Sequence, residues 1–270
     1  MPYCDSSKTS VGETKKSAHF PRGSAFPFNP RVSPAMYSQS LPIRWGRSES
    51  KPIVALPLWK RSLDIACCLV AFPFFALCTL IAAVVIKTVA PGPIFFQQER
   101  VGFMGRRFKL YKFRTMHEGA STSSHQSHFA ELVASKRPMQ KLDAKGDSRL
   151  IPGGWLLRAS GLDELPQIIN VLRGEMSIVG PRPCIPYEFE QYTGWQRKRL
   201  NSAPGLTGLW QVSGKNRTTF DEMIQFDVTY SEKRSLGMDL SIILRTVPAL
   251  CAQIGDTRKS RQAVQPKAAA

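Results

Sequence analysis

A run of 22 residues without a charged side chain, residues 65–86, sets the strongest limit on what this chain can fold into. About 20 helical residues cross the ~30 Å hydrocarbon core of a bilayer, so one transmembrane helix is the simplest interpretation. Pro73 lies in the first half of the run, where its ring and its missing N–H favour a kink. The run therefore predicts either a spanning helix or a helix that breaks inside the membrane.

Basic residues flank this run on both sides, with Lys60 and Arg61 before it and Lys87 and Arg100 among those after it. Cytoplasmic flanks of membrane helices carry the excess of Lys and Arg, so two basic flanks indicate that both ends lie on the same side. We expect a re-entrant helix hairpin that enters and leaves the cytoplasmic leaflet and breaks at Pro73. A spanning helix and a fully buried core helix are the alternatives.

Differences in amino-acid composition separate the two ends of the chain from the part between them. Residues 1–55 are rich in Ser, Pro and basic side chains without a sustained apolar period, which predicts a disordered basic leader rather than a signal peptide. The polar end of the chain predicts a disordered tail. The expected order is a leader over 1–55, a membrane hairpin over 58–88, a cytoplasmic domain over 89–250 and a tail over 256–270.

Short periodic segments predict the elements of the domain over 89–250. A short strand is expected over 94–97, and alternation of basic and apolar residues indicates a second over 108–114, which would pair with it as a hairpin. Helices are expected from Asp163, over 186–200, over 219–233 and over 240–250, and Gly174 is expected to end the first of them. The predicted fold class is α+β and mostly helical, with a re-entrant membrane hairpin, amphipathic surface helices and a small cytoplasmic domain that contains a short β-hairpin.

A net charge of +17 implies anionic partners, which include nucleic acid, an anionic membrane and phosphorylated substrates. A nucleic-acid-binding protein would explain the charge, but not the apolar run. Six cysteines without a CxxC pair and with no spacing typical of zinc indicate reduced thiols in a protein that faces the cytosol.

An acidic pair, Asp163 and Glu164, lies between Arg158 and Arg182 in the sequence. Helix capping by Asp163 and a favourable first-turn charge on Glu164 are the plain structural explanations. The arginines favour a second one, because guanidinium groups bind phosphate and a carboxylate can attack a phosphoryl group. Mg²⁺ prefers carboxylate and phosphate oxygens, so Glu164 is the expected metal ligand.

Further basic residues are candidates for phosphate contacts. Arg182 stands between two prolines, which would present its guanidinium at low entropic cost, although an ordinary surface turn explains the motif equally well. Lys112 and Arg114 lie on the second predicted strand, where a solvated strand face is the alternative to a phosphate or membrane contact. Residues 209–216 lack the glycine and the Ser or Thr of a P-loop.

The chain resembles the bacterial sugar transferases, the monotopic polyprenol-phosphate phosphoglycosyl transferases, over about residues 58–250. The motifs that carry the resemblance are KRSLDI (60–65), PGPIFFQQERVG (91–102), YKFRTM (111–116), LDELPQIINVLRGEMSIVGPRP (162–183) and PGLTGLWQVSG (204–214). Their length and order make them highly specific. The resemblance implies a cytoplasmic-leaflet hairpin broken near Pro73.

The resemblance also implies a reaction. Asp163 would attack the sugar-bearing phosphate of a UDP-sugar and release UMP, and undecaprenyl phosphate would then carry off the sugar phosphate. Arg158 and Arg182 would hold phosphates. Glu164, with Asp163 beside it, would bind Mg²⁺, or Mn²⁺ in its place. The sugar would be glucose or galactose, for exopolysaccharide, capsule or O-antigen synthesis.

The implied setting is the cytoplasmic face of the bacterial inner membrane, with anionic inner-leaflet lipids as partners and no nucleic acid; a homodimer is left open. One departure from the family pattern lies next to the acidic pair, where Gly161 replaces a serine. A catalytically inactive membrane scaffold of the same fold is the alternative function.

Overall fold

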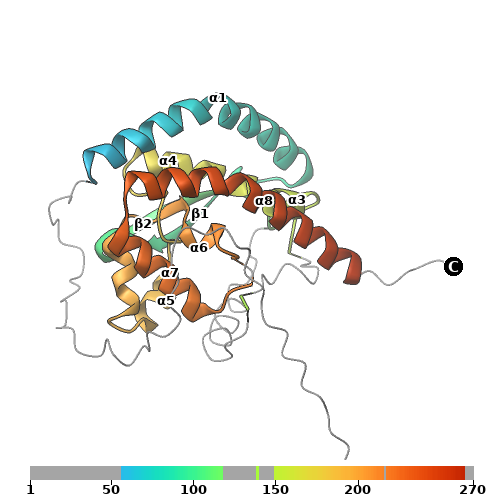
Figure 1. The fold of residues 1–270 in the computed structure, drawn as a ribbon. Coiled ribbons are helices and arrows are strands. Elements are labelled where there is room, and N and C mark those ends of the chain that lie inside the picture. Colours follow the sequence, from blue (N-terminus) through green and yellow to red (C-terminus); the bar gives the residue numbers. More distant parts are fainter. Residues whose placement is uncertain (1–55, 118–137, 140–148, 216, 265–270) are drawn as a thin grey trace, which may run out of the picture. The chain divides into compact units, whose positions relative to one another are not determined.

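The structure, a computed structural model, describes residues 56–117, 138–139, 149–215 and 217–264 (Figure 1). The predicted leader over 1–55 lies outside the described residues. Every described residue belongs to one compact unit. The prediction of a mostly helical fold with a short β-hairpin is confirmed.

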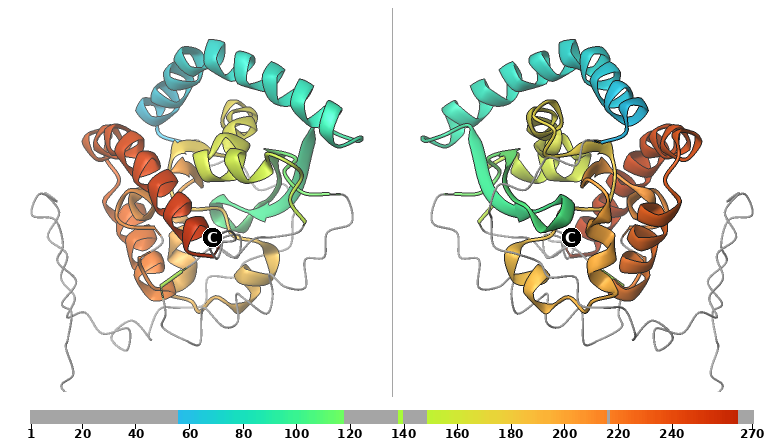
Figure 2. Two further views of the ribbon diagram at one scale, coloured as in Figure 1. Left: turned by 90° about the vertical axis from the view of Figure 1, so that its right-hand side faces the viewer. Right: turned by 90° about the vertical axis from the view of Figure 1, so that its left-hand side faces the viewer.

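The apolar run forms the greater part of one long helix, α1 (Leu58–Val89), with Pro73 inside it. Figures 1 and 2 show α1 bent part-way along its length. Its apolar side chains are largely exposed, as at Leu69, Val70 and Leu80. By length and composition, α1 and the segment Leu236–Asp256 near the C-terminus are the two described helices suited to crossing a membrane.

The N-terminal end of α1 is anchored in the protein by polar side chains. Lys60 Nζ donates to Asp239 Oδ2 (2.6 Å), to the Tyr230 hydroxyl (2.9 Å) and to the Val179 carbonyl (2.9 Å). One turn later, Asp64 Oδ1 accepts from the Ile178 N–H (2.8 Å). Lys60 is therefore a buried ion-pair partner, which removes it from the basic flank expected at a membrane surface.

Arg61 is engaged in the same region. Its two terminal nitrogens donate to the carbonyls of Val171 and Leu172, at the end of a short helix. The positive-inside argument thus loses both of its basic residues on this side of the apolar run, because each is committed to a structural contact.

The C-terminal end of α1 packs on the same unit through apolar side chains. Ile86 and Ala90 are buried against Phe113 and Ile151. Both ends of α1 consequently contact one folded unit, although the helix between them is largely exposed.

A β-hairpin follows α1. Strands β1 (Phe95–Val101) and β2 (Arg107–Phe113) pair antiparallel across the short 3₁₀ turn η2 (Phe103–Gly105). The two predicted strands and their pairing are confirmed, with β1 reaching four residues further than expected. A second small sheet joins β3 (Ser177–Val179) and β4 (Gly205–Thr207) in parallel.

Three short helical segments carry the region of the acidic pair: α3 (Gly154–Ser160), the 3₁₀ segment η4 (Leu162–Gln167) and α4 (Ile168–Leu172). Gly161, at φ +75°, separates the first two, and Gly174, also at φ +75°, follows the third. Glycine adopts this left-handed conformation without a steric cost, so the predicted stop at Gly174 is confirmed. The predicted cap is wrong, because Asp163 lies inside η4 and Gly161 precedes the segment.

Apart from β4, the regular elements that the structure describes after residue 185 are helical. The helix predicted over 186–200 is interrupted, forming α5 (Pro186–Gln191) and η5 (Gln196–Asn201). The short α6 (Leu209–Val212) precedes α7 (Phe220–Lys233), which matches its prediction. Thr219 caps α7 by accepting from the Glu222 N–H (3.3 Å), while Glu222 accepts from the Thr219 N–H (2.8 Å), as in a capping box.

The last helix, α8 (Leu236–Val264), is longer than the predicted 240–250. It takes in residues 256–264, part of the segment expected to be a disordered tail, and residues 265–270 lie outside the described part of the chain. Met238 and Ile242 pack in a cluster with Val179 and Tyr230, whereas Leu244 is exposed. One side of α8 is thus fixed to the unit and another presents apolar side chains outward.

Candidate active site

The acidic pair is held in a tight turn between two short helices. Asp163 is 7% exposed, whereas the Glu164 side chain is 41% exposed. The two neighbouring carboxylates therefore have different surroundings. A 3₁₀ turn has fewer residues per turn than an α-helix and is used in short pieces, so Asp163 and Glu164 are separated by about 120° around its axis.

The β-hairpin supplies a cation to this turn. Lys112 Nζ on β2 lies 2.9 Å from Glu164 Oε1 on η4, and the Lys112 side chain is 22% exposed. Strand β2 packs along η4, so the predicted basic strand and the acidic pair, 52 positions apart, meet in space. The sequence-based prediction did not pair these two residues.

Arg158 lies on α3, the helix that immediately precedes the acidic pair, and α3 packs against η4. The Arg158 side chain is partly exposed. Gly161 forms the turn that connects α3 to η4. A Cβ at this position would lie 3.4 Å from the side chain of Leu250 on α8.

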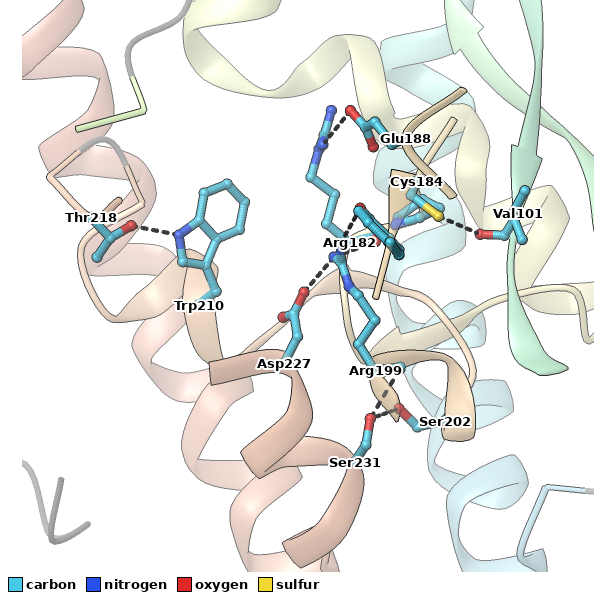
Figure 3. Close-up of polar contacts among 12 residues, drawn as sticks. Val101, Arg182, Cys184, Glu188, Arg199, Ser202, Trp210, Thr218, Asp227 and Ser231 are labelled. Carbon is cyan, nitrogen blue, oxygen red and sulfur yellow. Dashed lines mark hydrogen bonds and ion pairs between the residues drawn. The ribbon is translucent and has the colours of Figure 1, made fainter. Parts of the chain in front are cut away.

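Arg182 lies on the loop after β3. Its side chain is 36% exposed, and its Nη1 is 3.7 Å from Glu188 Oε1, a carboxylate near the start of α5 (Figure 3). This distance is that of an ion pair rather than of a short hydrogen bond, so the guanidinium keeps hydrogen-bonding capacity for a ligand.

Arg100 links this loop to the acidic pair electrostatically. The pKa of Arg100 is lowered to about 10, mainly by burial and in addition by the positive charge of Arg182, while the negative charges of Glu188 and Glu164 act in the opposite direction. Glu164 and Arg182 therefore act on one buried guanidinium. From the sequence, Arg100 was counted only among the basic residues that flank the apolar run and was not placed in the site, although it belongs to the motif over 91–102 and lies near the end of β1.

Arg114 has contacts that belong to the fold. Its Nη1 donates to the Pro91 carbonyl (3.0 Å) and its Nη2 to the Ala90 carbonyl. The side chain is buried. These hydrogen bonds satisfy carbonyl groups at the C-terminal end of α1 and join it to β2, which is a structural reason for a basic residue at this position.

No group of three or more His, Cys, Asp and Glu side chains is gathered for a metal ion among the residues that the structure describes. The donor set at the acidic pair is two adjacent carboxylates, one of them well exposed. Mg²⁺ commonly binds through one or two carboxylates together with substrate phosphates and water, so these residues fit that ion.

Comparison with known proteins identifies the family to which this chain belongs. The model of a family described as bacterial sugar transferase matches residues 56–253. The chain belongs to the bacterial sugar transferase family. The match takes in α1, the β-hairpin, the acidic pair and the Arg182 loop.

Relatives of this sugar transferase cover a similar span. The exopolysaccharide production protein ExoY of Rhizobium meliloti is 38% identical over 196 residues, which are 73% of this chain and 87% of the relative. A UDP-glucose:undecaprenyl-phosphate glucose-1-phosphate transferase of Caulobacter vibrioides is 39% identical over 210 residues, 74% of this chain and 72% of the relative. An undecaprenyl-phosphate galactose phosphotransferase of Salmonella typhimurium is 35% identical over 202 residues, but the match spans only 41% of that protein.

Proposed function

We propose that this sugar transferase moves a hexose-1-phosphate, that of glucose or galactose, from a UDP-sugar to undecaprenyl phosphate. UMP is released, and the lipid-linked sugar begins a repeat unit of exopolysaccharide, capsule or O-antigen. The names of two relatives support the acceptor and the two sugars. The observation that carries the proposal is the acidic pair, with a buried Asp163 beside the exposed Glu164 that contacts Lys112.

In the first step, a carboxylate oxygen of Asp163 attacks the phosphorus atom that bears the sugar. The bond from this phosphorus to the UMP oxygen breaks, and UMP leaves with the electron pair. The product on the protein is an aspartyl-phosphosugar. Asp163 suits this role because a carboxylate is a nucleophile toward a phosphoryl group that already carries a good leaving group.

In the second step, a phosphate oxygen of undecaprenyl phosphate attacks the same phosphorus. The bond between phosphorus and the Asp163 oxygen breaks, which restores the carboxylate and forms the diphosphate-linked sugar. Two displacements at one phosphorus need little from the protein beyond positioning and neutralisation of charge.

The basic residues around the pair provide that neutralisation. Arg182 and Arg158 hold phosphate oxygens, for which guanidinium groups are well shaped. Lys112 holds the Glu164 carboxylate in one orientation and offsets its charge, which lowers its repulsion toward an incoming diphosphate.

Glu164, with Asp163 next to it, is the residue that would hold Mg²⁺. The ion would neutralise the charge of the diphosphate and of the departing UMP. Lys112 and a metal ion would share the Glu164 carboxylate, which has two oxygens and several lone pairs.

The proposed setting is the cytoplasmic leaflet of a bacterial inner membrane, with α1 as a re-entrant hairpin. A helix of 32 residues is about 48 Å long when straight, which exceeds a bilayer core. The anchoring of both ends of α1 to one folded unit supports a helix that returns to the side it entered. The net charge of +17 favours anionic lipids at that surface.

A catalytically inactive scaffold with the same fold is the competing function, and one assay separates the two. UMP release is measured for the purified protein in detergent with a panel of UDP-sugars, undecaprenyl phosphate and Mg²⁺. We expect release with UDP-glucose or UDP-galactose. Binding of a UDP-sugar without release in any combination would favour the scaffold.

A further inference from the structure

The loop that carries Arg182 is held through its carbonyl oxygens. Pro181 and Pro183 have no N–H to donate, so this segment cannot be fixed by a regular ladder of its own amides. Its four successive carbonyls each accept a hydrogen bond: Pro181 from the Gly205 N–H (2.9 Å), Arg182 from Arg199 Nη2 (2.9 Å), Pro183 from Arg100 Nη1 (3.1 Å) and Cys184 from the Val101 N–H (2.8 Å). Three elements, β4, η5 and β1, thus hold one short loop.

The donor to the Arg182 carbonyl is itself held at both of its terminal nitrogens. Arg199 is fully buried, its Nη1 donates to the Tyr192 hydroxyl (2.7 Å), and its Nη2 also donates to the Asp227 carboxylate on α7. Asp227 is 1% exposed. The Ser231 hydroxyl holds the Arg199 carbonyl (3.0 Å), so main chain and side chain are both constrained.

A buried ion pair is an inefficient way to stabilise a fold. Removing two charges from water costs several kcal/mol per ion, and apolar side chains of similar volume are often at least as stabilising. An apolar pair cannot donate a hydrogen bond to the Arg182 carbonyl. The hydrogen bond to the Arg182 carbonyl is therefore a contact that an apolar pair at these two positions could not make.

We propose that Arg199 and Asp227 are positioning residues that act through Arg182. By holding the Arg182 carbonyl, the pair fixes the main chain at Arg182, and the guanidinium of this residue is thereby positioned to bind the substrate phosphates. Figure 3 shows the Arg182 side chain leading away from the Arg199–Asp227 pair toward Glu188. This inference rests on the proposed function, in which Arg182 is a phosphate ligand.

The test is a double-mutant cycle between the pair and Arg182. Replacing both partners, Arg199→Met with Asp227→Leu, removes the hydrogen bond to the Arg182 carbonyl and leaves neither member of the ion pair buried without its counter-charge. We expect kcat/KM for the UDP-sugar to fall roughly 10- to 100-fold, because a displacement of about 1 Å in a positioned group can cost 10²-fold.

In an Arg182→Ala background the same pair of substitutions should cause little further loss, because its effect passes through Arg182. Losses that simply multiply would overturn the inference. Arg217→Met is the matched control: this arginine is 77% exposed and pairs with Asp256 at the surface, and its replacement should leave kcat/KM unchanged.

Hydrogen exchange tests the loop without relying on turnover. The Val101 and Gly205 amides donate to loop carbonyls, and we expect both to exchange faster in the Arg199→Met/Asp227→Leu protein while amides of α8 keep their protection. Unchanged exchange at Val101 and Gly205 would overturn the positioning role. Absence of UMP release from the unaltered protein would instead contradict the proposed function, whatever the exchange result.

Discussion

Lys112 Nζ lies 2.9 Å from Glu164 Oε1, which brings a strand of the β-hairpin and the turn of the acidic pair into direct contact. Both side chains are partly exposed, and ion pairs of this kind contribute about 0–1 kcal/mol to stability. The contact therefore contributes little to the stability of the fold, and its main effect is on the orientation and charge of Glu164 in the candidate site.

We expect Lys112→Met to lower UMP release roughly 10- to 100-fold while shifting the melting temperature little, because Glu164 loses the group that orients and neutralises it. The measurements are initial rates and thermal unfolding of the same preparations. Lys109→Met, on the same strand and exposed, is the control and should keep full activity. A fall in activity that merely follows a loss of stability would count against this role for Lys112.

Asp163→Asn should reduce UMP release to background, since an amide cannot form the acyl-phosphate. Mass spectrometry of the unaltered protein, incubated with the UDP-sugar but without the lipid acceptor, should find a hexose phosphate on the peptide that contains Asp163. Asp221→Asn, at an exposed position on α7, is the control. Normal turnover by Asp163→Asn would remove this residue as the nucleophile.

Removal of divalent metal with a chelator should abolish UMP release, and Mg²⁺ should restore it. Glu164→Gln should raise the Mg²⁺ concentration that gives half-maximal activity, because an amide is a weaker ligand than a carboxylate. Full activity after thorough chelation would contradict a metal at this site. An unchanged Mg²⁺ requirement in Glu164→Gln would point to other ligands.

The re-entrant arrangement predicts that residues before and after α1 are reached from the same side of the membrane. Cysteines introduced at Ser50 and at the exposed Met104 would be labelled with a thiol reagent that does not cross membranes, in a Cys4→Ser/Cys251→Ser background. We expect both to react only after the cells are opened. Labelling of one position from outside intact cells would indicate a spanning helix.

Because Lys60 and Asp239 form a buried ion pair, we expect the replacement of Lys60 alone to destabilise the protein more than the replacement of both residues. Lys60→Met leaves the Asp239 carboxylate buried without its cation, so we expect a loss of about 3–5 kcal/mol in the free energy of unfolding. The double variant Lys60→Met/Asp239→Leu should recover much of it. Denaturant titration of the three proteins is the measurement, and a double variant less stable than Lys60→Met alone would contradict the explanation.

Local patterns accounted for much of the fold. Alternation predicted the second strand of the hairpin, the helix expected over 219–233 matches α7, and Gly174 marked the end of the helix after the acidic pair. These features depend on neighbours within a few residues, so one sequence is enough to find them. The cap at Asp163 failed because Gly161 turns the chain one step earlier and a 3₁₀ segment forms.

The candidate site was predictable only in part. From residue types and the family motifs, Asp163, Glu164 and Arg182 were proposed as candidates. Arg100 and Arg199 were not, because a buried arginine resembles a surface one until its partners are known. Arg114 was a candidate for a phosphate contact, but in the structure its guanidinium donates hydrogen bonds to carbonyl groups at the end of α1.

The sequence alone determined that this chain has a long apolar helix, an acidic pair among arginines and the motifs of a sugar transferase, because each of these is a property of consecutive residues. Only the tertiary structure decided that Lys60 is buried against Asp239, 179 positions away, and that Lys112 meets Glu164. Burial and ion pairing depend on which distant segments pack together, and that packing minimises the free energy of the whole folded unit rather than of any local stretch.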